Sequence, residues 1–334
     1  MSELQYLEVP DLMLQKGGIL PKARLAWRSI GELNAARDNA VLVPSWYTGN
    51  DDTSEMFFTG EQRALDPSKY FIILTNLLGN GRSSSPSNTP APQERSRFPT
   101  VTYHDNVALQ HKLVTEVLGI ERLRLVTGWS MGAAQTYQWA AQYPDAVEAA
   151  VPIAGSARCA SYNAVFLYSL RRTLMLDPVF EQGFYSRPPI EGLKAFATIY
   201  AGWGVSEPFF REKAYSAFGA DDHADFVANF WEPFFLQHDA NDLLAMLRTW
   251  ELGDISDSTA YEGDLEAALA GIKARLITVP VDNDRYFPPV DEEYATSKIP
   301  NGECRTVNSI WGHMAPMNLD NAEVFDNILR EALG

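Results

Sequence analysis

A serine flanked by two glycines stands at the junction of a strand pattern and a helix pattern. The element spans residues 128–132 and reads GWSMG, after the apolar run LRLVT and before the helical segment AAQTYQWAAQY. Its glycines permit the close backbone packing of a sharp strand-to-helix turn. Such a turn lifts the Ser130 hydroxyl above the edge of a sheet, where a neighbouring base can activate it as a nucleophile. An ordinary glycine-flanked helix start is the alternative, and the flanking patterns favour the nucleophile.

Short apolar runs alternate with helical patterns along the chain, which is typical of a mainly parallel sheet flanked by helices. Strand candidates cover residues 40–44, 70–75, 123–127, 149–153 and 276–281, with a weaker one at 304–307. Helix candidates cover residues 106–118, 131–143, 290–297 and 321–333. The strand candidates are almost continuously apolar, as expected for strands covered on both faces. The sequence therefore predicts an α/β fold.

The alternation stops between residues 164 and 270, where helical patterns continue without a convincing strand. Aromatic residues recur there at helical spacing. We expect a helical cap over residues 164–270, inserted into a core built from residues 1–163 and 271–334. A stretch rich in Ser, Pro and Asn at residues 79–99 predicts a long surface loop.

A base and an acid for the serine are expected late in the chain. His313 is the one histidine of five that follows the last strand candidate and precedes the last helix. Its imidazole can take the serine proton and return it to a leaving group. The loop after residues 276–281 offers two aspartates, Asp282 and Asp284. Asp282 suits a bond to its own turn, so Asp284 is the preferred partner that fixes the imidazole tautomer.

An oxyanion formed on acyl attack needs fixed hydrogen-bond donors. One donor should be the main-chain N–H of Met131, directly after the serine. The second should come from the loop that follows residues 40–44, where we favour the main-chain N–H of Tyr47. Both roles belong to the backbone, so they constrain the side chains weakly.

Charge and cysteine usage exclude several classes of partner. The chain carries 27 basic and 43 acidic residues, a net charge of −16, which disfavours nucleic acid and anionic membranes. Its longest apolar runs are too short to span a bilayer, and its first residues lack a secretory pattern, so we expect a cytoplasmic protein. Cys159 and Cys304 lie outside any metal-ligand spacing, so no metal or cofactor is expected and both should be reduced thiols.

Taken together, these motifs resemble the homoserine O-acetyltransferase family of α/β hydrolases over most of the chain. The matching segments are YTG at 47–49, TNLLG at 75–79, FPT at 98–100, GWSMG at 128–132, DP at 177–178, DRYFP at 284–288 and GH at 312–313. The resemblance implies an α/β-hydrolase fold with a helical cap and a catalytic triad of Ser130, His313 and Asp284. It also implies oxyanion donors at Tyr47 and Met131 and a homodimer joined through the cap helices, which we place between residues 197 and 250.

This chain departs from that family at positions that would bind the amino-acid acceptor. The resemblance places an aspartate and an arginine where this chain has Met314 and Ala197, and a glycine where it has Trp129. A zwitterionic acceptor buried without partners would cost several kcal/mol. Nothing in the spacing of the cap arginines indicates a substitute; these are Arg171, Arg172, Arg211 and Arg248.

An aromatic cap over an exposed serine suits a small uncharged ester. We therefore expect a serine esterase, a carboxylic-ester hydrolase that acts on short-chain acyl esters, acetyl esters above all, through a covalent acyl-enzyme. The alternative is an acyl-CoA-dependent O-acetyltransferase that acts on homoserine or another alcohol. A third hypothesis is a ligand-binding relative without catalysis, which the three competent residue types at the triad positions disfavour.

Overall fold

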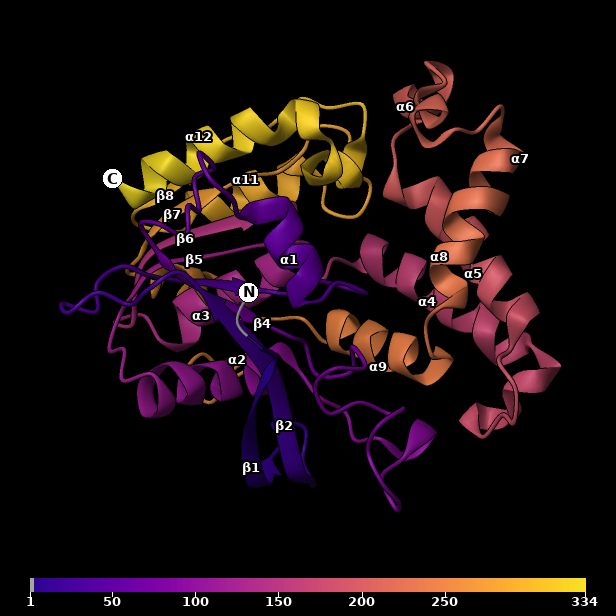
Figure 1. Cartoon of the computed structure of the whole chain (residues 1–334), viewed down its shortest axis with the longest axis horizontal. Coiled ribbons are helices and arrows are strands. Elements are labelled where there is room, and N and C mark those ends of the chain that lie inside the picture. Colours follow the sequence, from indigo (N-terminus) through magenta and orange to yellow (C-terminus); the bar gives the residue numbers. More distant parts are fainter. Residues whose placement is uncertain (1–2) are drawn as a thin grey trace.

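The computed structural model describes residues 3–334 and contains one eight-stranded sheet (Figure 1). The strands are β1 (Gln5–Met13), β2 (Ile19–Ile30), β3 (Ala40–Pro44), β4 (Phe71–Thr75), β5 (Leu123–Trp129), β6 (Val147–Ile153), β7 (Arg275–Thr278) and β8 (Gly302–Cys304). Their order across the sheet is β1-β2-β4-β3-β5-β6-β7-β8. The pairs β1–β2 and β2–β4 are antiparallel, and all other neighbours are parallel. The predicted α/β fold with a mainly parallel sheet is confirmed.

The strands predicted from apolar runs are the buried parallel ones, whereas β1 and β2 were missed. Strands β3 and β4 are buried at every position, because helices cover both faces of the sheet there. Strand β1 lies at the edge and is mostly exposed, so its sequence lacks a continuous apolar run. Strand β8 covers residues 302–304 instead of 304–307, and Val307 forms only an isolated bridge with Val281.

Helices cover the two faces of the sheet in separate groups (Figure 1). One face packs against α1 (Asp51–Phe58) and α12 (Ala322–Leu333). The other packs against α2 (Tyr103–Lys112), α3 (Met131–Gln142), α10 (Leu265–Ala270) and α11 (Pro289–Ser297). The carboxyl ends of the parallel strands therefore share one edge, where the loops after β3, β5 and β7 meet.

Six of the seven α-helices between β6 and β7 stand beside the sheet at this edge (Figure 1). They are α4 (Ser161–Leu176), α5 (Ile190–Gly204), α6 (Glu207–Arg211), α7 (His223–Phe226), α8 (Glu232–Leu236) and α9 (Ala240–Glu251). Helix α5 packs against α4 and α8, and α4 also packs against α9. The division into core and cap stays a proposal; α10, at the end of the expected cap range, contacts α11.

The prediction that residues 79–99 form a surface loop was wrong for residues 83–86, whereas residues 87–92 are exposed or half-buried. Residues 83–86 are buried, and the Ser83 hydroxyl accepts a hydrogen bond from the Ala26 N–H at 2.9 Å. The same hydroxyl donates to the Asn76 carbonyl at 2.8 Å. The serines of this loop thus satisfy main-chain groups beside strand β2, a role that composition alone does not reveal.

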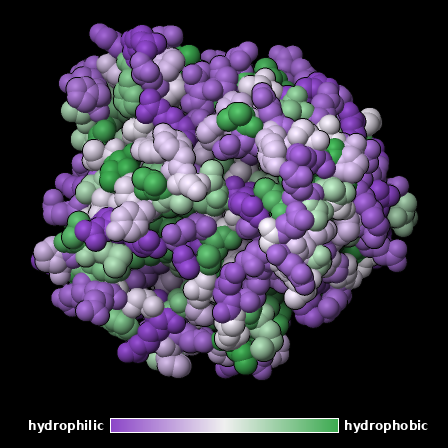
Figure 2. Space-filling view, turned by 180° about the vertical axis from the view of Figure 1, so that it is seen from behind, coloured by the Kyte–Doolittle hydropathy of each residue, from purple (hydrophilic) through white to green (hydrophobic). Residues whose placement is uncertain are grey.

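Hydrophilic side chains dominate the face seen in Figure 2, and hydrophobic ones form small separate groups among them. This distribution agrees with a net charge of −16. Within residues 3–334, no helix combines the length and the apolar character that crossing a bilayer requires.

Candidate active site

The serine motif folds into a strained turn between β5 and α3. Ser130 has φ 59° and ψ −120°, a left-handed backbone that a non-glycine residue adopts only when its surroundings impose it. The Ser130 N–H donates to the Ile153 carbonyl at 2.9 Å, which ties the turn to strand β6. A Cβ on Gly132 would lie 2.5 Å from the Pro44 carbonyl oxygen, so only glycine lets the turn approach β3 this closely. The expected strand–turn–helix geometry is present, and it resembles a nucleophile elbow.

His313 lies opposite this turn and is paired with Asp284. Its Nδ1 is 2.7 Å from Asp284 Oδ2, and both side chains are almost fully buried. The other carboxylate oxygen accepts the main-chain N–H groups of Tyr286 and Phe287 at 2.7 and 3.3 Å. These bonds hold the carboxylate in place and orient it toward the imidazole.

The competing aspartate points elsewhere. Asp282 Oδ1 accepts the Ser309 N–H at 2.9 Å and is solvent-exposed. It therefore bonds main chain at the neighbouring loop, as the sequence favoured. Of the two aspartates, Asp284 is the one that the structure brings to His313.

Ser130, His313 and Tyr47 line the same small cavity of about 80 Å³. Further lining residues are Trp46, Thr48, Gly49, Thr53, Phe57, Trp129, Tyr200, Phe230, Trp231, Phe234, Met314 and Met317. Within residues 3–334, Ser130 Oγ makes no hydrogen bond with His313; bonds of this kind often tighten only when a substrate is present. The volume is far below the several hundred Å³ of pockets for drug-sized ligands, so the cavity suits a small substrate.

Of the two expected oxyanion donors, Met131 directly follows Ser130, and Tyr47 lines the same cavity. Met131 is the first residue of α3, and Tyr47 follows β3 in a turn where Thr48 has φ 65°. In the part of the chain that the structure describes, neither main-chain N–H has an acceptor. The Tyr47 hydroxyl donates to the Leu243 carbonyl of α9 at 3.3 Å, and burial raises the pKa of this phenol well above its ordinary value. The side chain of Tyr47 is thus fixed in its neutral form, and its main-chain N–H has no hydrogen-bond acceptor among the described residues.

Two aromatic residues at the site had no assigned role in the sequence prediction. Trp129 Nε1 donates to the His313 carbonyl at 3.0 Å, and the two rings are 5.1 Å apart. The Tyr286 ring lies edge-on to the imidazole at 4.5 Å. Both residues belong to the motifs that carry the resemblance, yet their contacts with His313 join distant segments and are invisible in the sequence.

The cavity lining contains no Asp, Glu, Lys or Arg among the described residues. Met314 lines it where the resemblance places an aspartate, and Ala197 is buried in the cap. Arg171 and Arg248 both bind Glu251, and Arg211 binds Glu207, so these arginines are engaged outside the cavity.

Other candidate chemistry is lacking among residues 3–334. No group of three or more His, Cys, Asp or Glu side chains is arranged to hold a metal ion. Cys159 and Cys304 are free thiols, as expected. The remaining histidines do not line the cavity: His111 stacks on Tyr143 at 3.8 Å, and His238 Nδ1 lies 2.9 Å from the carbonyl of Phe234, a lining residue.

Comparisons with known proteins identify the family and the fold of the chain. Residues 41–315 match the family described as the alpha/beta hydrolase fold. An ethyl acetate hydrolase from Pseudomonas veronii is 40% identical over 97% of this chain and 93% of its own length. A homoserine O-acetyltransferase from Trichormus variabilis is 30% identical over 94% of this chain and 89% of its own. The solved structure of the acetyl esterase MekB superposes with a TM-score of 0.96 at 39% identity, covering 99% of this chain and 97% of that one. The resemblance predicted from the sequence is confirmed.

Proposed function

Because the chain belongs to the α/β-hydrolase fold family, we propose that it is a carboxylic-ester hydrolase that acts on short-chain acyl esters, acetyl esters above all. Relatives named as an ethyl acetate hydrolase and an acetyl esterase support this activity. We also propose that the substrate is a small uncharged ester, that no cofactor is required and that the protein is cytoplasmic, as predicted from the sequence.

One observation carries the proposal: Ser130 and His313 open into a small cavity whose described lining has no charged side chain. A neutral ester loses little hydration on entering such a cavity. A homoserine molecule would bring an ammonium and a carboxylate, and burying them without partners costs several kcal/mol. The lining therefore favours neutral substrates over an amino-acid acceptor.

In the proposed acylation step, Ser130 is the nucleophile and His313 the base. His313 takes the proton of Ser130 Oγ as the oxygen attacks the ester carbonyl, and Asp284 stabilises the imidazolium that forms. The carbonyl oxygen becomes an oxyanion facing the free N–H groups of Tyr47 and Met131. Collapse of this intermediate breaks the bond to the alcohol oxygen, which receives the proton from His313 and leaves.

Water then discharges the acyl-enzyme. His313 removes a proton from water, the hydroxide oxygen attacks the acyl carbon, and Ser130 Oγ recovers its proton as the carboxylic acid leaves. Water needs access and a base, both of which the cavity offers. Homoserine needs charged partners, and their loss typically lowers kcat/KM by about two to three orders of magnitude.

Side-by-side assays test the proposal. Ethyl acetate or phenyl acetate, and separately acetyl-CoA, would each be supplied with millimolar homoserine, and acetate would be quantified against O-acetylhomoserine. We expect acetate to dominate with the esters, and acyl esters of increasing chain length to be hydrolysed progressively more slowly. Predominance of O-acetylhomoserine with either donor would establish the alternative, acyl transfer.

The protein is further proposed to be a homodimer joined through cap helices. Large exposed apolar side chains gather on α4, at Tyr162, Val165, Tyr168, Met175 and Leu176. Residues 197–250, where the sequence placed the contact, have no large exposed apolar side chain in the structure. Their aromatic residues pack on one another inside the cap instead, for example Tyr200 on Phe235 at 4.8 Å. Helix α4 is therefore the better candidate for the contact.

A further inference from the structure

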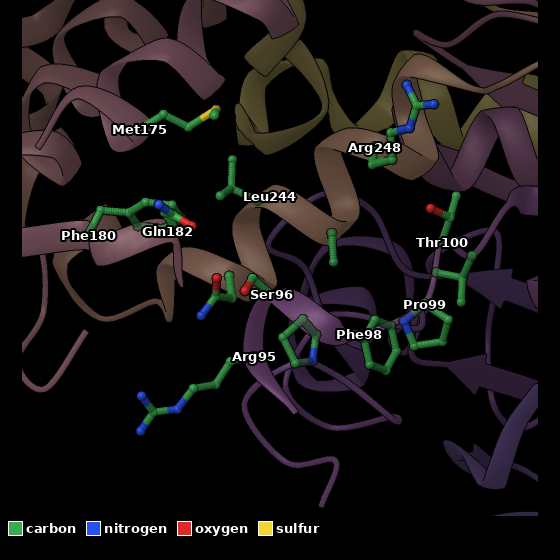
Figure 3. A pocket seen from close by; sticks show the side chains of 14 residues that line it. Arg95, Ser96, Phe98, Pro99, Thr100, Met175, Phe180, Gln182, Leu244 and Arg248 are labelled. Atoms are coloured by element: carbon green, nitrogen blue, oxygen red, sulfur yellow. The ribbon is translucent and has the colours of Figure 1, made fainter. Parts of the chain in front are cut away.

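A second cleft, of about 560 Å³, is lined by Leu244, Ala245 and Arg248 of helix α9 (Figure 3) and shares no lining residue with the Ser130 cavity. The loop at residues 95–101 forms one wall, and the end of α4, the short helix Pro178–Gly183 and α9 form the other. None of the residues assigned to catalysis lines it. Its volume is about seven times the 80 Å³ of the Ser130 cavity and falls in the range of small-molecule sites.

The lining combines an apolar floor with two cations and no acid. The apolar residues are Pro86, Phe98, Pro99, Val101, Met175, Phe180, Leu244 and Ala245. Arg95 and Arg248 stand on opposite sides of these residues (Figure 3). The lining contains no Asp or Glu, although the chain has 43 acidic residues against 27 basic ones. The positive charge of this cleft, in a protein of negative net charge, favours the binding of an anion.

Both arginines have donors to spare. Arg95 forms no ion pair within residues 3–334, and its guanidinium donates only to the Tyr185 carbonyl, at 3.1 Å. Arg248 lies 2.8 Å from Glu251 Oε2, and Arg171 lies 3.2 Å from the same oxygen. One carboxylate cannot neutralise two guanidinium groups, so positive charge remains at that end.

The other carboxylate on α9, that of Asp242, does not cancel this charge. Asp242 turns to the loop, where Ser87 donates to it from its N–H at 2.9 Å and its hydroxyl at 2.6 Å. Asp242 does not line the cleft. Burial also raises the pKa of its carboxyl to about 7, which disfavours its charged form.

We propose that this cleft is a second ligand site for a small organic anion with an apolar body, such as a medium-chain carboxylate. The apolar floor would cover the chain of the ligand, and the guanidinium of Arg95 or Arg248 would take its carboxylate oxygens. Helix α9 connects the two sites, because Leu244 lines the cleft while the carbonyl of Leu243 accepts the hydrogen bond of Tyr47. The site is independent of the ester chemistry proposed above.

Calorimetric titration of the full chain with octanoate, and with 1-octanol as the uncharged comparison, tests the proposal. We expect octanoate to bind at one site per chain and at least tenfold more tightly than octanol. Arg95→Gln or Arg248→Gln, whichever removes the guanidinium that binds the carboxylate, should weaken octanoate about tenfold, and the double variant should weaken it at least as much. Arg211→Gln is the matched control, because Arg211 is an exposed cap arginine outside the cleft, and it should leave the affinity unchanged.

A second pair of variants keeps the test decisive if an arginine variant fails to fold. Leu244→Glu places a negative charge in the cleft, whereas Leu244→Gln adds a neutral polar group of similar size. The Glu variant should bind octanoate at least tenfold more weakly than the Gln variant. Absence of octanoate binding at millimolar concentration, equal affinity for octanol, or binding that survives both arginine changes would each overturn the proposal.

Discussion

The indole of Trp129 donates a hydrogen bond to the main-chain carbonyl of His313, at 3.0 Å across 184 positions of sequence. Trp129 also lines the cavity and packs on Trp46 at 5.0 Å between ring centroids. The residue before the nucleophile thus holds the loop that carries the base. Where the resemblance implies a glycine, this chain has a side chain that both positions His313 and fills space beside Ser130.

Replacing Trp129 with Phe keeps an aromatic wall and removes the donor. A hydrogen bond between neutral groups contributes about 0.5–1.5 kcal/mol net, so we expect kcat for acetate esters to fall about two- to tenfold. Trp46→Phe is the matched control, since Trp46 lines the same cavity and its indole makes no hydrogen bond in the described chain. Equal losses in both variants would show that Trp129 acts by packing alone.

Removal of the nucleophile or the base should nearly abolish ester hydrolysis. Ser130→Ala and His313→Ala should each lower kcat by about 10⁴-fold or more, because these groups act as a unit. Asp284→Asn should cost somewhat less, through loss of the tautomer that its 2.7 Å bond to His313 favours. Asp282→Asn is the control and should retain nearly full activity; a severe loss there would reverse the assignment of the acid.

A buried acid in α11 should make stability depend on pH. Burial raises the pKa of Glu292 from 4.5 to about 8, although the Tyr137 hydroxyl donates to it at 2.7 Å. The folded state therefore holds this proton more tightly than the unfolded state, and the free energy of unfolding should fall as pH rises from about 4.5 to about 8. Urea unfolding at pH 5 and pH 8 should show this fall in the wild type and a smaller one in Glu292→Gln. Glu293→Gln, at an exposed neighbouring position, should behave like the wild type.

Charge on the exposed face of α4 should separate the proposed dimer. Val165 is 65% exposed in the single chain, and a lysine there would be buried without a partner in a contact through α4. Light scattering should give twice 37.2 kDa for the wild type and 37.2 kDa for Val165→Lys. Met13→Lys, at a position 70% exposed on β1, should leave the mass unchanged. A wild-type mass of 37.2 kDa at all concentrations would contradict the dimer.

The sequence by itself determined the features that depend on local physics. Continuous apolar runs marked β3 and β4, because strands buried on both faces tolerate few polar residues. The glycines on either side of Ser130 predicted the sharp turn. A side chain at Gly132 would collide with the Pro44 carbonyl at the end of β3. The order of the segments singled out His313 as the base, and it lies in the same cavity as Ser130.

Tertiary structure decided what depends on contacts between distant segments. The edge strand β1 and its neighbour β2 escaped prediction because their partly exposed faces carry no continuous apolar signal. The sequence favoured Asp284, but its contact with His313 joins segments 29 positions apart and is formed only in the folded chain. The small volume and uncharged lining of the cavity arise only when α1, the cap and the His313 loop close over Ser130. A linear sequence specifies these side chains, but their distances follow from the packing of the whole sheet and its helices.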